Sequence, residues 1–156
     1  MIPHRALPPY DWPALMSLIR HAFAGMEGRI DPPSSMHALT PEGIAEQAVL
    51  GEVWTLGNPA IACVVLSPRA GSLYLHKLAV DPAHQRQGHA RSLIATAAAR
   101  AMALGLPAVT LSTRVELVEN HAAFRALGFH ETQRSSHPGF ARPTTVHFTL
   151  PLGAPR

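Results

Sequence analysis

The chain has 156 residues, of which 47% are hydrophobic and 15% are charged. This composition is typical of a folded domain with a substantial core, and it excludes a disordered chain. The formal net charge is +3, but Lys77 is the only lysine and basic residues form no run, so we expect no nucleic-acid partner. We expect a single domain over residues 1–156, with its core over about 2–150.

The N-terminus lacks the basic segment and apolar stretch of a signal peptide, and no apolar run approaches the length of a membrane span. A cytoplasmic protein with no membrane partner, either a monomer or a homodimer, is therefore expected. Cys63 is the only cysteine, which excludes a disulfide bond within the chain. It lies in the apolar run IACVVL. We expect Cys63 to be a small core residue rather than a nucleophile.

Hydrophobic periodicity and capping residues predict the secondary structure in chain order. Asp11 with Pro13 marks the beginning of a first helix, and Thr40 with Pro41 marks a second. Residues 25–39 between them are rich in Gly, Pro and Ser but carry apolar side chains, which predicts a packed, irregular segment. The expected elements are a strand at 2–7, helices from 11 to 25 and 40 to about 50, strands at 52–56, 60–66 and 73–80, a helix from 88 to about 104, a strand at 108–112, a helix at 121–127 capped by Asn120, and strands at 129–134 and 144–150.

This order predicts a mixed α/β sheet. Residues 60–66 are continuously apolar, which indicates a strand buried on both faces, and 67–72 (SPRAGS) indicate a turn into an antiparallel neighbour at 73–80. Residues 108–112 follow a crossover helix and are expected to lie parallel to 73–80. Because only part of the pairing is parallel, the strict alternation of a doubly wound fold is excluded.

The segment 73–94 combines a strand, a turn and a helix. Asp81-Pro82 ends the strand, and the helix opens on Gln85-x-x-Gly88-x-Ala90. Small residues leave backbone N–H groups uncovered at a helix N-terminus, which attracts anions. These residues alone favour a phosphate site and an ordinary strand-to-helix connection equally. The GxGxxG and GxxxxGK[ST] motifs are both absent, which argues against nicotinamide dinucleotides and ATP.

Two motifs together resemble those of the GNAT N-acetyltransferase superfamily. LAVDPAHQRQGHARSLI resembles the family's acetyl-CoA signature, Gln/Arg-x-x-Gly-x-Gly/Ala after a strand. ENHAAFRALGFHE resembles the later motif, in which Asn precedes a short helix that ends in Gly-Phe. The predicted order of elements also agrees with the family's fold, so the resemblance covers most of the chain.

The resemblance implies a mixed, mostly antiparallel central sheet, with a parallel pair splayed at the cofactor site and helices on both faces. It implies an N-acetyltransferase that moves the acetyl group of acetyl-CoA, its co-substrate, to a primary amine by direct attack in a ternary complex. A small-molecule acceptor is expected, because no acidic run exists to recruit a basic peptide.

Carried over by position, the motifs assign a set of cofactor-binding residues. Residues 85–91 would wrap the pyrophosphate through backbone N–H groups, and 78–80 would offer backbone groups to the pantetheine and to the thioester oxygen. Asn120 would contact the pantetheine or the neighbouring backbone. The expected cofactor-binding residues are Leu78, Ala79, Val80, Gln85, Arg86, Gln87, Gly88, His89, Ala90, Arg91, Asn120 and Phe124.

Phe124 departs from the family pattern. Relatives often carry a Tyr near this position, which protonates the leaving thiolate, and a phenyl ring has no such proton. Phe124 is expected to pack against the cofactor arm. The departure also supports an alternative function, a catalytically weak or inactive acyl-CoA-binding sensor or interaction domain. Transfer of a longer acyl group, or transfer to an oxygen, is a third hypothesis.

The general base cannot be assigned from the sequence alone. His76 and Tyr74 are candidate catalytic residues because they share a strand face, which Leu78 and Val80 would also share, with Lys77 on the other. Glu116 is a third candidate, in a loop expected beside that strand, and Glu119 lies in the same loop. The alternative for His76 is a structural strand histidine or a surface residue, and the alternative for Glu116 and Glu119 is a solvated loop charge. Candidate acceptor-site residues are Glu27, Arg29 and His137.

Ten histidines raise the question of a metal site. Neither HExxH nor CxxC is present, and no histidines have the spacing of a ligand pair on a helix. We therefore expect no metal.

Overall fold

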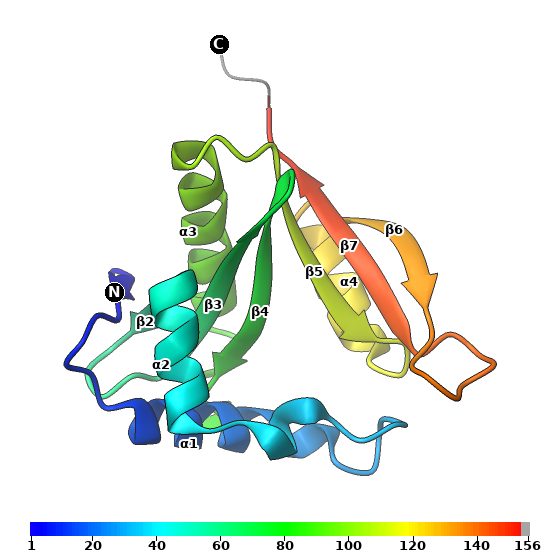
Figure 1. The fold of residues 1–156 in the computed structure, drawn as a ribbon, viewed down its shortest axis with the longest axis horizontal. Coiled ribbons are helices and arrows are strands. Elements are labelled where there is room, and N and C mark those ends of the chain that lie inside the picture. The colour runs from blue at the N-terminus through cyan, green and yellow to red at the C-terminus, as the bar shows by residue number, and fades with distance from the viewer. Residues whose placement is uncertain (154–156) are drawn as a thin grey trace.

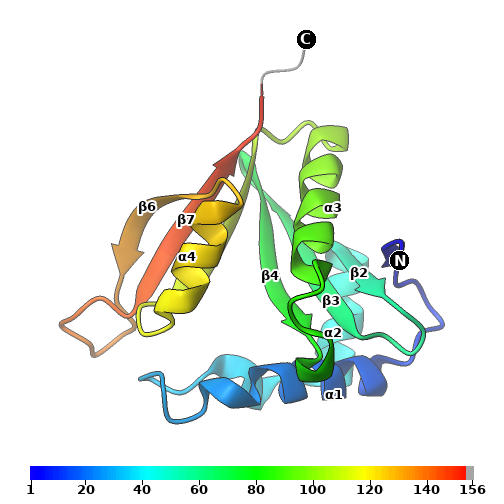
Figure 2. The same cartoon turned by 180° about the vertical axis from the view of Figure 1, so that it is seen from behind.

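The computed structural model describes residues 1–153, and its strands form one seven-stranded sheet in the order β1-β2-β3-β4-β5-β7-β6. Helices α1 and α2 cover one face of this sheet, and α3 and α4 lie on the other (Figure 1 and Figure 2). The strands are β1 (His4–Arg5), β2 (Glu52–Leu56), β3 (Ala62–Arg69), β4 (Ser72–Val80), β5 (Ala108–Arg114), β6 (His130–Ser135) and β7 (Thr145–Pro151). The α-helices are α1 (Trp12–Phe23), α2 (Pro41–Leu50), α3 (His89–Ala103) and α4 (Val118–Ala126), with short 3₁₀ helices η1 (Ala24–Met26), η2 (Ser35–Ala38) and η3 (Pro82–His84).

The pair β4·β5 is parallel, and every other pair of neighbours in the sheet is antiparallel. The expected mixed, mostly antiparallel sheet with helices on both faces is therefore confirmed. Strands β4 and β5 pair only at Leu73 with Val109 and at Tyr74 with Thr110. Beyond these residues the two strands diverge (Figure 1). We call this divergence the split, and its head lies just past Tyr74 and Thr110.

Strand β4 contains a β-bulge within the split, just beyond its last pair with β5. His76 pairs with Val65 and Ala79 pairs with Cys63, so Lys77 and Leu78 together oppose the single residue between them on β3. Lys77 has a positive φ of 50°, which an extended strand residue does not adopt.

Because of the bulge, the alternate residues of β4 that face the core before Lys77 are not in step with those that face it after Lys77. Leu75 faces the core beneath α3, and after the bulge Leu78 and Val80 pack against that same core. Tyr74 and His76 therefore lie on the opposite face from Leu78 and Val80, and the expectation that all four share a face is wrong. The expectation that Lys77 points away from His76 is also wrong, because its Nζ lies 3.3 Å from the His76 Nδ1.

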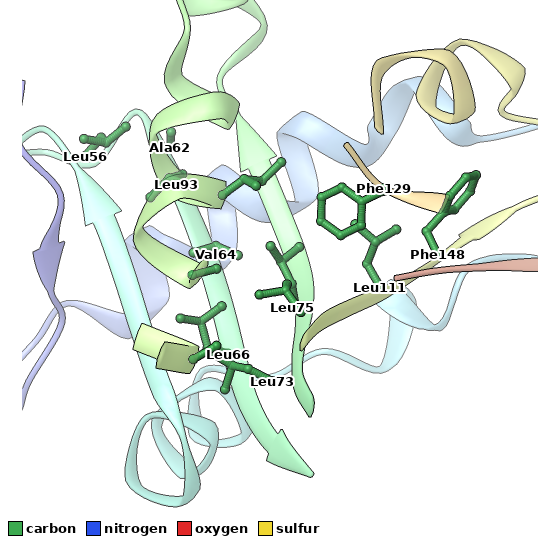
Figure 3. Packing of buried hydrophobic residues seen from close by; sticks show 14 of the residues in the cluster. Leu56, Ala62, Val64, Leu66, Leu73, Leu75, Leu93, Leu111, Phe129 and Phe148 are labelled. Atoms are coloured by element: carbon green, nitrogen blue, oxygen red, sulfur yellow. The ribbon is translucent and has the colours of Figure 1, made fainter. Parts of the chain in front are cut away.

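Two apolar cores hold the layers together, one on each face of the sheet. Figure 3 shows the first, in which Leu93 of α3 lies over apolar side chains of β3 and β4, while Phe129 and Phe148 pack across β5. The second joins α1 and α2 to the other face and contains Cys63, which is fully buried as expected. Strand β3 thus carries buried residues on both faces over Ala62–Leu66, which confirms the prediction from its continuous apolar run.

Local signals predicted some boundaries correctly and others not. The Asp11 side chain caps α1 and the Thr40 side chain caps α2, as expected. The hairpin between β3 and β4 is tighter than predicted, because both strands continue until only Ala70-Gly71 remains between them. Helix α4 begins earlier than predicted, with Leu117 as its N-cap, so Asn120 lies inside its first turn rather than capping it.

One ion pair is largely enclosed by the fold. The Glu52 carboxylate accepts hydrogen bonds from Arg100 Nε at 2.7 Å and from the other end of the guanidinium at 2.8 Å. Trp54 Nε1 donates to the same carboxylate at 2.9 Å. The pair joins β2 to α3.

No helix among residues 1–153 is long and apolar enough to cross a membrane.

Candidate active site

A cleft of about 1100 Å³ passes through the sheet at the split. The diverging strands β4 and β5 form its walls, together with the end of α1, the beginnings of α3 and α4, and the segment after α1. We call that segment, residues 24–40, the strap. The cleft exists because strand pairing stops at Tyr74 and Thr110, which leaves the edge of β4 beyond Tyr74 without a partner among the strands of the described chain. A cleft between unpaired parallel strands offers both free backbone groups and access from both faces of the sheet.

One end of the cleft is built for an anion. Arg86 and Gly88 have positive φ angles of 63° and 83°, so the backbone curls immediately before α3 begins at His89. A Cβ built on Gly88 would meet no atom within 4 Å, which means that the space above this turn is open. Arg91 in the first turn of α3 also lines the cleft. Backbone N–H groups at a helix N-terminus and nearby guanidinium groups together favour a phosphate.

Stacked rings lie at the head of the split. The rings of Tyr74 and His76 lie 5.1 Å apart, and the Arg69 guanidinium lies 3.6 Å from the Tyr74 centroid. His76 Nε2 lies 2.8 Å from the Ser67 hydroxyl, and its Nδ1 faces the Lys77 ammonium. Both ring nitrogens of His76 are therefore occupied by protein partners.

Burial, and then the positive charges of Lys77 and Arg69, lower the pKa of His76 to about 3. His76 is consequently neutral at any physiological pH, and it is a weak proton acceptor. Burial likewise lowers the pKa of Lys77.

The strap is tied to the far side of the split by polar contacts. Arg29 forms an ion pair with Glu119 at 2.6 Å. Arg114 of β5 donates to the backbone carbonyls of Pro32 at 2.6 Å and Pro33 at 3.2 Å. These contacts hold the strap across the cleft, where Arg29 and His137 line its wall.

Two other candidate residues lie outside the cleft lining. Glu27 pairs with His37 at 2.9 Å, and both side chains are well exposed. Glu116 Oε2 accepts a hydrogen bond from the backbone N–H of Asp31 at 3.2 Å and lies 3.8 Å from an Arg142 nitrogen. Its carboxylate thus fastens the strap to the loop after β5.

A polar chain that the sequence did not single out lies on the wall formed by β5. Ser112 Oγ lies 3.0 Å from His147 Nδ1, and His147 Nε2 lies 2.7 Å from Ser135 Oγ. The three residues come from β5, β7 and β6. Each strand was predicted, but the contact depends on the register between them, which no local pattern reveals.

The family model described as the acetyltransferase (GNAT) family matches residues 12–129. The chain belongs to the GNAT acetyltransferase family. It is thus an acyltransferase of a family that uses acetyl-CoA. The match includes α1, the strap, the split and the turn before α3, so it extends over most of the cleft lining.

Solved structures share this GNAT fold at low sequence identity. The ribosomal-protein-S18-alanine N-acetyltransferase from Escherichia coli is 20% identical, with a TM-score of 0.70 over 99% of this chain and 97% of that one. A GNAT family acetyltransferase from Elizabethkingia anophelis with acetyl-CoA bound is 18% identical, with a TM-score of 0.69 over 96% and 97%. A putative GNAT acetyltransferase from Desulfovibrio desulfuricans is 15% identical, with a TM-score of 0.76 over 97% and 98%. No curated protein sequence matched this chain.

The residues around the turn before α3 in this GNAT domain offer groups that fit a CoA ester. All the expected cofactor-binding residues line the cleft except Gln87, whose side chain turns to His89 at 3.2 Å. His84 also lines it, and its buried Nδ1 has no hydrogen-bond partner among residues 1–153, as expected for an atom that a ligand or water satisfies. Phe124 of α4 packs against Phe129 and Phe148 at ring distances of 5.8 and 6.1 Å.

Neither a reactive cysteine nor a metal ion was expected to take part in the chemistry. Burial raises the pKa of the Cys63 thiol to about 12, so this GNAT domain keeps it protonated and unreactive. Among residues 1–153, no group of three or more His, Cys, Asp or Glu side chains is placed to hold a metal ion.

Proposed function

We propose that the protein is an N-acetyltransferase that moves the acetyl group of acetyl-CoA to the primary amine of a small molecule. The observation that carries this proposal is the cleft through the split, which has an anion-binding turn at one end and polar side chains at the other. Acetyl-CoA and the amine can then approach β4 from opposite faces and meet at its unpaired edge.

The donor half relies on backbone groups. The N–H groups of residues 85–90 would bind the pyrophosphate, and Arg86 and Arg91 would add charge. The pantetheine would lie along β4 beyond Tyr74, where that strand has no partner on β5. A backbone N–H within Leu78–Val80 would donate to the thioester oxygen and stabilise the negative charge that forms on it.

The acceptor half brings the amine to the same carbon. The amine nitrogen attacks the thioester carbonyl, the new C–N bond forms, and the C–S bond breaks to release the CoA thiolate. Arg29 of the strap and His137 line the cleft and are proposed to contact the acceptor. The contacts between the strap and β5 enclose this end, which favours a small acceptor over a folded protein. The protonated, buried Cys63 argues against an acyl-enzyme intermediate.

Phe124 supports a second candidate function. Its side chain has no proton to give the departing thiolate, and it sits in an aromatic cluster with Phe129 and Phe148. A domain that binds acyl-CoA tightly and turns it over slowly or not at all would tolerate this residue. Such a domain would act as a sensor of the cofactor or as a partner-binding module.

Two measurements on the full chain separate these functions. Acetyl-CoA should raise the melting temperature, since a ligand that binds only the native state stabilises it, and no shift at millimolar acetyl-CoA would contradict both candidates. Thiol release is then measured with primary alkylamines, arylalkylamines, amino acids and a short peptide with a free N-terminus. Release that depends on the amine supports the enzyme, whereas binding without release supports the sensor.

A further inference from the structure

Ser112 lies at the head of the split. It stands two residues beyond Thr110, which is the last residue of β5 that pairs with β4. His76 stands two residues beyond Tyr74 on the opposite wall, so parallel register brings these two side chains to the same depth. Ser112 lines the cleft, and the neighbouring Leu111 points into the core on the other face. The Ser112 hydroxyl thus faces the acceptor end.

Ser112 is the first member of a hydrogen-bonded chain that runs outward across three strands. His147 lies on the same face as Ser112, because the adjacent Phe148 points into the core on the α4 side. Ser135, the third member, lies at the end of the edge strand β6. Ser112 lines the cleft, so an acceptor molecule in the cleft can reach it. Ser135 is partly exposed, so solvent can reach the outer end of the chain.

The histidine on the β4 wall does not suit the role of base. His76 is bound by Ser67 and Lys77 on its two ring nitrogens, and cations surround it. His147 instead contacts two hydroxyl groups, each of which can donate or accept. Two charged residues of these strands have partners of their own, since Arg114 donates to the carbonyls of Pro32 and Pro33 and Arg134 of β6 pairs with Glu131.

We propose that Ser112 and His147 form the proton relay that deprotonates the acceptor amine, with Ser135 holding the imidazole. This inference rests on the proposed acetyl transfer. In the relay, the neutral His147 ring carries its proton on Nε2, and this N–H donates a hydrogen bond to Ser135 Oγ. Nδ1 is then free to accept a hydrogen bond from Ser112. As the amine nitrogen bonds to the thioester carbon, its proton passes to Ser112 Oγ while the Ser112 proton passes to Nδ1. The C–S bond then breaks, and the imidazolium returns its proton to the solvent or to the thiolate.

Kinetics on the full-length protein tests the relay, with acetyl-CoA and the amine that gives the fastest thiol release. Ser112→Ala and His147→Gln should each lower kcat by about 100-fold, as expected for loss of a general base, and leave the KM for acetyl-CoA unchanged. The acidic limb of the pH profile of kcat should disappear in both variants. Ser112→Thr, which keeps the hydroxyl, should retain most of the activity. His130→Asn, an exposed histidine on β6, is the matched control and should behave as wild type.

A variant with wild-type kcat and an unchanged acidic limb at Ser112 or His147 would overturn the relay. A second measurement needs no acceptor and decides the matter even if no amine is turned over. Nitrogen-15 NMR of the imidazole rings should show the neutral His147 ring protonated on Nε2, with an Nδ1 resonance that shifts in Ser112→Ala. A proton on Nδ1 of the neutral ring would refute the relay, whereas absence of thiol release from every amine would refute only the proposed function.

Discussion

Gly88→Glu is the sharpest test of the donor end. Gly88 has a φ of 83°, and a side chain added there would project into the open space above the turn, where the pyrophosphate is proposed to bind. The introduced carboxylate would lie within several ångströms of a phosphate. Two like charges about 4 Å apart repel by about 4 kcal/mol at the effective dielectric of a protein surface. Acetyl-CoA affinity should therefore fall by about a thousandfold, since about 1.4 kcal/mol corresponds to tenfold.

The backbone strain of this substitution has to be separated from its charge. Any L-residue at this positive φ costs about 1–2 kcal/mol, so Gly88→Gln carries the same strain and a side chain of the same size without the charge. Calorimetric titration with acetyl-CoA should give a much larger loss of affinity for Gly88→Glu than for Gly88→Gln. Equal losses would mean that no phosphate lies near the turn, and unchanged affinity in both would remove the donor site from this loop.

Three further predictions concern stability and turnover. Glu52→Gln should lower the free energy of unfolding by about 1.5 kcal/mol, because it weakens the charge-assisted hydrogen bonds from an Arg100 side chain that is 30% exposed, and urea denaturation measures this against the exposed control Glu46→Gln. Burial alone would raise the pKa of Glu52, but the hydrogen bonds from Arg100 and Trp54 outweigh burial and lower that pKa. The stabilisation from Glu52 is therefore present above the pKa of an unfolded glutamate and is lost as the pH falls through the folded pKa. An acid scan in which wild type and Glu52→Gln lose stability in parallel would contradict this. Phe124→Tyr should raise kcat for acetyl transfer by supplying a proton for the thiolate, and an unchanged kcat would show that thiolate protonation does not limit turnover. Lys77→Val should lower the free energy of unfolding by about 2 kcal/mol more than Lys77→Gly, since a β-branched residue tolerates a positive φ worst, and equal effects in thermal denaturation would contradict a bulge at this position.

The sequence predicts those parts of the molecule that depend on residues close together in the chain. Asp11 and Thr40 signal helix starts because each needs only a backbone N–H a few residues on. The turn before α3 is visible for the same reason, since glycine marks a positive φ and small residues mark an uncovered helix N-terminus. Asn120 shows the limit of such signals. It is a good capping residue by type, but Leu117 occupies the cap, and Asn120 lies one turn further on, lining the cleft.

The parts that could not be predicted depend on pairing between distant segments. Nothing in LYLHKLAV marks Lys77 as a bulge, because lysine has no preference for positive φ and the extra residue follows from the register of β4 against β3. The contact between Ser112 and His147 requires the antiparallel register of β5 with β7, in which these two residues are direct partners. Polar residues at alternate strand positions predict only that a face is not core.

In the proposed function, the bulge would let a single strand serve two substrates. Without it, Tyr74 and His76 would share a face with Leu78 and Val80, and β4 would present either four groups to the core or four to the acceptor side. With it, Tyr74 and His76 lie on the face opposite the core beneath α3, while Leu78 and Val80 pack against that core. The edge of β4 that does not pair with β5 lies within the split, between the face with Tyr74 and His76 and the face with Leu78 and Val80. A thioester held along that edge would therefore have the acceptor groups of β4 and Ser112 of β5 on one side and the CoA arm on the other. This arrangement requires the bulge to lie within a few residues of the last β4–β5 pair.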